Sequence, residues 1–165
     1  MRILGIDTSL RATGYGLLDK DGQRLRPVAW GVIRNAPELS PATCLLRIHQ
    51  GLRDLTAQYA PDCAAVENIF YFRNALTALR LGEARGVAVL TMKLAVAEVF
   101  GYDSRRVKLA VVGRGAARKE QVQTMVRHIL GLHGAELTAD SADALAIAIC
   151  HAFHAGSPVP AGEKL

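Results

Sequence analysis

The sequence predicts a mixed α/β fold, in which a central five-stranded sheet is flanked by helices. Three observations lead to this prediction. Short apolar runs of strand length fill the first 34 residues, longer segments with apolar residues at three- and four-residue spacing follow, and two more short apolar runs lie between those segments. The predicted order is βββαβαβαα, three antiparallel strands and then two parallel ones, which is typical of a layered α/β domain. We expect one domain over residues 1–156 and a flexible tail over 157–165.

The first three strands are expected over residues 2–8, 13–18 and 23–34. The first is a continuous apolar run, and the second alternates in polarity around Tyr15 and Leu17. The sequence Asp-Lys-Asp-Gly at 19–22 is a turn signal between the second strand and the third. Short turns of this kind join antiparallel neighbours.

The first helix is predicted to begin after Ser40, which can act as an N-cap and is followed by proline at the first helical position. Pro61 should end it. Apolar residues recur at helical spacing and give one buried face, namely Leu45, Ile48, Leu52, Leu55 and Tyr59. The short apolar run at 63–67 then predicts a buried strand, parallel to the first strand of the chain.

A second, long helix is predicted over residues 74–97 and is rich in small residues. Gly82 and Gly86 lie one turn apart, which lowers the intrinsic helix stability and allows another backbone to approach closely. Packing of this face in the core is the simpler interpretation, and a subunit interface is the alternative.

The last third of the chain predicts one strand and two helices. Residues 99–107 are expected to form a strand, or a strand and a turn. Residues 119–130 have the apolar spacing of an amphipathic helix, and residues 141–153 form a strongly apolar one. His151 and His154 lie on this last helix and are interpreted as packing or surface residues.

Composition narrows the functional classes. Among 165 residues, 20 basic and 15 acidic side chains give a net charge of +5 and favour a polyanionic partner. Three cysteines without C-x-x-C spacing indicate free thiols in a reducing compartment rather than a zinc site or a disulfide scaffold. No signal peptide is recognisable, and the most apolar stretch, 86–100, is too short to span a bilayer. We therefore expect a cytoplasmic protein with no membrane contact.

Four carboxylates occupy unusual positions at the ends of apolar segments. Asp7 and Glu67 end two strands that are expected to be parallel neighbours, while Asp140 and Asp143 open the last helix on one face. A turn aspartate at 7 and helix-capping aspartates at 140 and 143 are the plainer interpretations. Acids beside buried segments are costly unless a cation compensates them. A shared site for Mg²⁺ or Mn²⁺ therefore explains all four together, and two such ions catalyse phosphoryl transfer.

Two further segments suggest contacts with nucleic acid. Three consecutive aromatic residues, Phe70, Tyr71 and Phe72, follow Glu67 and cannot all point into the core, so at least one is expected to contact a base, with Arg73 on phosphate. Between residues 104 and 119 there are six basic residues and no acid. A solvated loop is the plainer explanation of that run. Positive charge at the start of a helix, at Arg118 and Lys119, favours an external anion instead.

With these residues assembled, the chain resembles the RuvC family of bacterial Holliday junction resolvases, in the RNase H-like nuclease superfamily. The resemblance covers nearly the whole chain. It rests on Gly5-Ile6-Asp7 with residues 13–16, and on the segments at 81–87, 111–113 and 139–146. It implies an RNase H-like fold and a homodimer that binds four-way DNA junctions. Two symmetric metal-dependent nicks would leave 5′-phosphate and 3′-hydroxyl ends in recombination and repair. It also implies the branch-migration proteins RuvA and RuvB as partners.

The resemblance also implies roles for individual residues. Asp7, Glu67, Asp140 and Asp143 match the catalytic acids that bind the metal, expected to be two Mg²⁺ ions with Mn²⁺ as the open alternative. The residues expected to bind DNA are Phe70, Tyr71, Arg73, Lys108, Arg114, Arg118 and Lys119. One departure is that Thr8-Ser9 stand where the family commonly has Pro-Gly, so the turn after Asp7 must be formed differently.

Two rival functions remain open from the residues alone. The sugar-kinase and actin ATPase class also begins with a Gly-Ile-Asp strand, although this chain offers only one lobe and no second glycine-rich nucleotide segment. A non-catalytic DNA-binding module would use the basic stretch but would leave the four acids unexplained.

Overall fold

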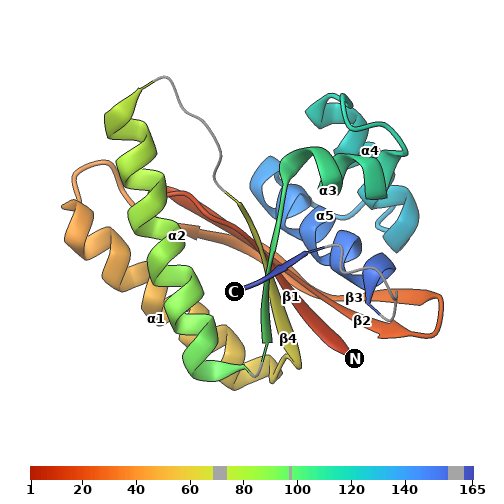
Figure 1. Cartoon of the computed structure of the whole chain (residues 1–165), viewed down its shortest axis with the longest axis horizontal. Helices are drawn as coiled ribbons and strands as arrows, with labels where there is room; N and C mark the ends of the chain where they lie inside the picture. The colour runs from red at the N-terminus through yellow and green to blue at the C-terminus, as the bar shows by residue number, and fades with distance from the viewer. Residues whose placement is uncertain (69–73, 97, 156–161) are drawn as a thin grey trace.

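The computed structural model describes residues 1–68, 74–96, 98–155 and 162–165 (Figure 1). Within these ranges the chain forms one mixed sheet with the strand order β3-β2-β1-β4-β5-β6. The strands are β1 (Arg2–Asp7), β2 (Ala12–Asp21), β3 (Arg24–Arg34), β4 (Cys63–Glu67), β5 (Glu98–Tyr102) and β6 (Glu163–Lys164). The helices are α1 (Pro41–Tyr59), α2 (Ala75–Ala95), α3 (Ser104–Val112), α4 (Lys119–Leu130) and α5 (Ala139–His154).

The central strands have the predicted directions. β1 pairs antiparallel with β2 and parallel with β4, and β4 pairs parallel with β5. Because Ile6 is opposite Val66 in the parallel pair, Asp7 and Glu67 follow at the same edge of the sheet. The prediction that these two acids meet at the carboxyl ends of neighbouring strands is confirmed.

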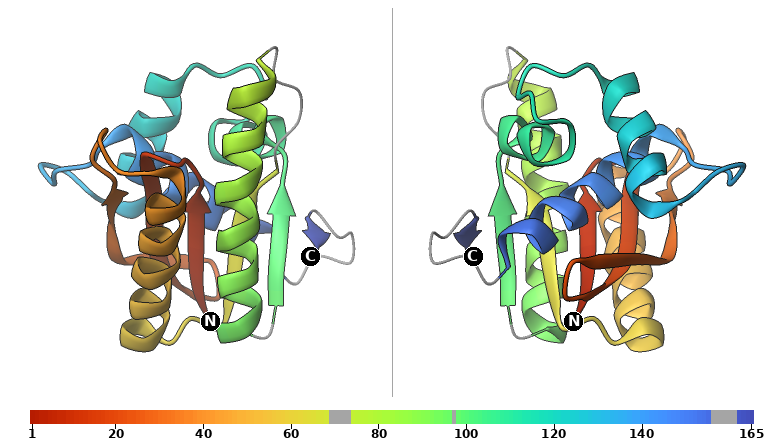
Figure 2. Two further views of the ribbon diagram at one scale, coloured as in Figure 1. Left: turned by 90° about the vertical axis from the view of Figure 1, so that its left-hand side faces the viewer. Right: turned by 90° about the vertical axis from the view of Figure 1, so that its right-hand side faces the viewer.

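The sheet separates two layers of helices, each with its own core. Helices α1 and α2 cover one face, and α3, α4 and α5 cover the other (Figures 1 and 2). Successive residues of a strand point to opposite faces, so Leu4 packs against α1 and α2 while Ile3 packs on the side of α5. The N-caps of α1 and α2 are Ser40 and Asn74, whose side chains accept hydrogen bonds from the backbone N–H groups of Thr43 and Thr77.

Helix α5 lies unusually close to β1 and β2. A Cβ atom added at Gly5 would lie 2.1 Å from the carbonyl oxygen of Ala144, and one added at Gly14 would lie 2.1 Å from the carbonyl oxygen of Asp140. Bare glycine backbone therefore sets the distance between this helix and the two strands. α5 is apolar on nearly all sides because the sheet covers one side and α3 and α4 cover another.

Two predictions about the periphery need correction. Residues 103–112 form a cap and a helix, not the end of a strand and a loop: β5 ends at Tyr102, and Asp103 is the N-cap residue of α3. Val107 and Val111 lie four residues apart and are both buried. Residues four apart share one face of a helix, so a helix buries both side chains although valine by itself favours a strand. The expected flexible tail also gains structure at its end, since Glu163–Lys164 pair antiparallel with β5 as a sixth strand.

His151 is a buried residue that ties α5 to two strands. Its Nδ1 lies 2.8 Å from the hydroxyl of Tyr102, its Nε2 lies 3.3 Å from Sγ of Cys63, and its ring stacks on Phe100. The prediction of a packing role is confirmed for this residue. Burial lowers the pKa of His151 to about 4, because the imidazolium would lose its hydration.

This histidine should make the protein sensitive to acid. Between pH 6.5 and 4 the unfolded chain binds a proton at His151 that the folded chain does not, so the free energy of unfolding falls as the pH falls. We expect the stability of the wild type, relative to His151→Gln, to fall by about 2 kcal/mol between pH 7 and pH 4.5. Urea denaturation at a series of pH values measures this difference, and equal pH profiles for the two proteins would contradict it.

None of the helices that the structure describes is both long and apolar enough to cross a membrane.

Candidate functional site

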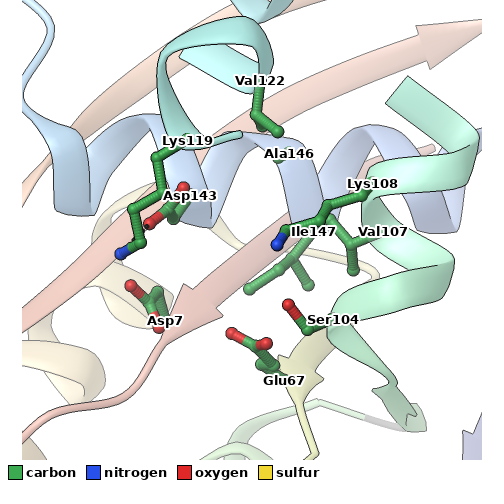
Figure 3. Close-up of a pocket in the computed structure, with 10 residues that line it drawn as sticks. All are labelled: Asp7, Glu67, Ser104, Val107, Lys108, Lys119, Val122, Asp143, Ala146 and Ile147. Carbon is green, nitrogen blue, oxygen red and sulfur yellow. Dashed lines mark hydrogen bonds and ion pairs between the residues drawn. The ribbon is translucent and has the colours of Figure 1, made fainter. Parts of the chain in front are cut away.

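A polar cavity of about 150 Å³ opens at the sheet edge where β1 and β4 end (Figure 3). Five elements contribute to it, and its apolar wall is formed by Val107, Val122, Ala146 and Ile147. The polar residues that line it are Asp7, Glu67, Ser104, Lys108, Lys119 and Asp143. The cavity thus gathers three of the four predicted acids with two of the predicted DNA-binding lysines.

Asp7 carries the most perturbed carboxylate of the site. Burial at the strand end, together with the negative charges of Glu67 and Asp143, raises the pKa of Asp7 to about 7. Lys119 opposes this effect only in part. The negative charge in the cavity is therefore under-compensated by the protein's own cations near neutral pH.

Glu67 lies beside Asp7 and is held by a helix on its other side. Burial raises the pKa of Glu67, while a hydrogen bond from the hydroxyl of Ser104 lowers it. Ser104 is the first residue of α3, directly after the N-cap Asp103. Ser104 was not among the predicted site residues, because a serine in the first turn of a helix carries no local sign of a second partner.

Asp143 and Lys119 form an ion pair in the cavity. The Nζ atom of Lys119 lies 3.2 Å from Oδ2 of Asp143, and the charge of Asp143 raises the pKa of Lys119. Lys119 opens α4, where a positive charge is unfavourable with respect to the helix dipole. The acids of the cavity supply the compensating negative charge, and Figure 3 shows the lysine side chain directed toward Asp143 and Asp7.

Asp140 occupies the margin of the site. It lies in the first turn of α5, one turn before Asp143, and is not among the residues that line the cavity. Its charge nevertheless raises the pKa of both Asp7 and Lys119. The structure therefore brings three acids onto one cavity and places the fourth beside them.

The donor set fits a hard divalent cation in its chemistry. Carboxylate oxygens from three separate elements face one cavity and carry excess negative charge, which is the environment that Mg²⁺ and Mn²⁺ prefer. As the side chains stand, no three Asp, Glu, His or Cys residues in the part of the chain that the structure describes are close enough together to hold an ion. Ion binding would therefore require the carboxylates to move closer together.

The predicted DNA-binding residues fall into three groups. Lys108 and Lys119 line the cavity, whereas Arg114 and Arg118 are exposed in the link between α3 and α4. Phe70, Tyr71 and Arg73 lie outside the described residues.

The turn after Asp7 is closed by hydroxyl groups. The hydroxyl of Thr13 donates to the backbone carbonyl of Ser9 over 2.7 Å, and the backbone N–H of Ala12 contacts Oγ of Ser9 at 3.4 Å. Thr8 and Thr13 are both buried. Side-chain hydrogen bonds of this kind can shape a tight turn without proline or glycine at these positions.

Comparison with known proteins identifies the family. A family model described as crossover junction endodeoxyribonuclease RuvC matches residues 3–151. The chain belongs to the RuvC family. RuvC of Acidiphilium cryptum is 52% identical over 163 residues, covering 97% of this chain and 96% of the relative. RuvC of Gluconacetobacter diazotrophicus is 48% identical over 168 residues, covering 100% and 99%.

Solved structures agree with this assignment. Thermus thermophilus RuvC in complex with Holliday junction substrate superimposes with a TM-score of 0.91 at 33% identity, over 100% of this chain and 99% of that one. The yeast mitochondrial Holliday junction resolvase Ydc2 matches with a TM-score of 0.63 at 15% identity, over 91% and 78%, which supports the fold alone.

These matches confirm the predicted RuvC family, its RNase H-like fold and the class of crossover junction endodeoxyribonuclease. Membership of this nuclease family also implies dependence on a divalent metal. The family match decides against the ATPase and against the non-catalytic module.

Proposed function

We propose that this chain recognises four-way DNA junctions and cuts two strands symmetrically, leaving 5′-phosphate and 3′-hydroxyl ends. In this proposal Asp7, Glu67, Asp140 and Asp143 hold two Mg²⁺ ions, with Mn²⁺ able to replace them. The observation that carries the proposal is the convergence of acids from β1, β4 and α5 on one cavity that also contains Lys108 and Lys119. Phosphodiester hydrolysis needs both kinds of charge, cations for the phosphate and carboxylates for the metals.

The chain's own residues position the reacting groups. When bound, the two cations would supply an activated water and stabilise the departing oxygen, as in other two-metal phosphoryl-transfer sites. The charges of both Glu67 and Asp143 act on Asp7, so Asp7 is the residue best placed to help hold a cation beside either of these acids. Ser104 orients Glu67, and the apolar wall at Val107 and Ile147 limits access of bulk water.

Lys108 and Lys119 are proposed to bind the phosphates next to the cut. Lys119 is paired with Asp143 in this structure and its side chain is 71% exposed, so it can turn to a phosphate once a cation compensates Asp143. Arg114 and Arg118 are exposed in the link between α3 and α4, the helices that carry Lys108 and Lys119, and would extend the contact along the DNA backbone. Phe70, Tyr71 and Arg73 are proposed to contact the junction near the cut on the family resemblance.

Helix α2 offers a surface for the second subunit of a homodimer. Four leucines on its outer side are exposed, Leu76 by 61%, Leu79 by 57%, Leu90 by 61% and Leu94 by 76%. Gly82 and Gly86 lie on the same helix with open space beside their Cα atoms. An apolar helix face of this size favours a protein partner, and two nicks in a two-fold junction require two active sites.

Association with RuvA and RuvB and a cytoplasmic location are proposed on the family resemblance.

The dimer proposal predicts a change in mass. Replacing Leu90 and Leu94 together by glutamate should convert the protein from twice the 17.7 kDa chain mass to a monomer, because the charges could not be buried between the subunits. Light scattering after size exclusion measures this, with Leu109→Glu on α3, 55% exposed, as the matched control that stays dimeric. A dimer that withstands both charges would exclude α2 as the interface.

A labelled four-way junction tests the function directly. The protein is incubated with the junction and with a linear duplex of the same sequence, in Mg²⁺, in Mn²⁺ and in EDTA. We expect paired nicks in the junction alone, products that a ligase seals, and no cutting in EDTA. Binding without cutting in either metal would reject the proposed reaction.

A further inference from the structure

The segment at 81–87 contributes to the family resemblance, yet the proposed reaction gives it no task. It forms the middle of α2, which together with α1 covers one face of the sheet (Figure 1). Its half-buried Arg85 reaches to the end of β4. The Nε atom of Arg85 donates to the backbone carbonyl of Glu67 over 3.1 Å, and its second terminal nitrogen donates to Oδ1 of Asn68 over 2.8 Å.

Asn68 also contacts β5 and the N-cap residue of α3. Its backbone N–H donates to the carbonyl of Tyr102 over 2.8 Å, and its side-chain nitrogen lies 3.4 Å from Oδ1 of Asp103. Gly101 lies directly against the amide, since an added Cβ would be 2.3 Å from Oδ1 of Asn68. The amide therefore fills a space that exists only because residue 101 has no side chain, and Arg85 closes that space.

The contact continues into the site through α3. Asp103 is the N-cap residue of α3, and the next residue, Ser104, hydrogen-bonds the carboxylate of Glu67. Arg85 thus holds the backbone of Glu67 directly, and through Asn68 and Asp103 it holds the helix start that orients the carboxylate. Lys108, one turn later on the same helix, lines the cavity.

We propose that Arg85 is a positioning residue for the nuclease reaction, which fixes the end of β4 and the start of α3 relative to one another. This inference rests on the proposed function. The guanidinium donates to a backbone carbonyl and an amide oxygen, both uncharged, so its planar fork matters more than its charge. A lysine ammonium is a point donor on a flexible stem and cannot reproduce the two fixed directions.

The plainer explanation is that Arg85 only attaches α2 to the sheet. The two explanations differ in what is lost when the contact is removed. A structural attachment affects the stability of the fold. A positioning residue affects the rate of cutting and the metal requirement, because a displacement of about 1 Å at a reacting group costs about 100-fold in rate.

The experiment compares Arg85→Met and Arg85→Lys with Arg80→Met in the full-length protein. Arg80 is on the same helix and pairs with Glu83 at 3.0 Å, so it controls for loss of an arginine from α2. We expect single-turnover cutting to fall by about 30-fold in both Arg85 variants, with junction affinity in Ca²⁺ unchanged within about twofold. The Mn²⁺ concentration for half-maximal cutting should rise, and so should the Kd for Mn²⁺ measured by electron paramagnetic resonance without DNA. Arg80→Met should match the wild type.

Asn68→Ala gives a second approach in case the Arg85 variants do not fold. It should also lower the rate of cutting, and the double variant with Arg85→Met should lose less than the two single losses combined, because the contact between Arg85 and Asn68 is removed in both single variants. Wild-type cutting by Arg85→Met, full activity of Arg85→Lys, or a loss in Arg80→Met equal to that in Arg85→Met would each overturn the inference. A wild-type protein that leaves the junction intact would instead overturn the proposed function.

Discussion

Replacing Asp7 by asparagine is expected to stop junction cutting and to make the metal-free protein more stable. Cutting should fall by about 1000-fold or more, since the variant loses the carboxylate at the centre of the charge cluster. Junction binding in Ca²⁺ or EDTA should persist, because loss of a negative charge weakens no attraction to DNA. Stability should rise, because the folded chain no longer confines an under-compensated charge.

The gain in stability depends on pH in a defined direction. The pKa of Asp7 is raised from 3.8 to about 7, so between these values the folded chain holds a proton that the unfolded chain has released. The contribution of Asp7 to stability is thus present at low pH and lost as the pH rises through 7. Asp7→Asn should therefore add about 2–4 kcal/mol at pH 8 in EDTA and little at pH 4.

Urea denaturation at pH 4 and pH 8 measures this gain, with Asp54→Asn as the control because Asp54 is exposed on α1. Adding Mg²⁺ or Mn²⁺ should stabilise the wild type at pH 8 and have little effect on Asp7→Asn, because the metal compensates the same charge. A variant that cuts normally in Mg²⁺, or one destabilised equally at both pH values, would contradict the role assigned to Asp7.

Gly14→Ala is the second change with a large expected effect. The new methyl group would lie 2.1 Å from the carbonyl oxygen of Asp140 and 2.6 Å from its carbonyl carbon. Both atoms belong to backbone, so no side-chain rotation relieves the contact and α5 must move away from β2. We expect a loss of about 3 kcal/mol in stability and about 100-fold in cutting rate, because the helix that moves carries Asp140 and Asp143.

Gly31→Ala is the matched control for this substitution. It is also a glycine within the sheet, but its added Cβ would meet the hydroxyl end of Tyr15 at 2.6 Å, a side chain that can swing away. This variant should keep most of its activity. Denaturation and single-turnover cutting of the two variants provide the comparison, and equal activity of Gly14→Ala and the wild type would show that the α5 spacing does not position the acids.

The chain's local signals were sufficient for most of the elements. The N-cap at Ser40 and the end of β4 at Glu67 lie where the pattern predicted them, and α2 begins one residue after its predicted start, because capping and apolar periodicity act between near neighbours. The signal failed at residues 103–112, where three valines favour a strand locally, whereas the chain forms a helix that buries Val107 and Val111 and packs against α5. It failed again at Glu163–Lys164, because pairing with the distant β5 produces no pattern in the residues around this strand.

The sequence likewise predicted some residues of the candidate site and missed others. The acids could be found because each is costly where it stands, whatever surrounds it. Ser104, Asn68 and Arg85 could not be found, because a serine, an asparagine and an arginine in ordinary positions carry no such cost. Their roles depend on which atoms they reach, over 2.8 Å and 3.1 Å for Arg85, and those distances arise from packing between elements.

The amino-acid sequence by itself determined the first five strands, the family and the four acids that are proposed to carry the chemistry. The tertiary structure alone decided that three of these acids share a cavity while Asp140 stands at its margin, that Lys119 neutralises Asp143, and that Arg85 holds the end of β4. The physical reason is the distance along the chain over which each effect acts. Periodicity, capping and the cost of a misplaced charge act within a few residues of the chain, whereas the distance between two side chains from different elements is set by the packing of every layer between them.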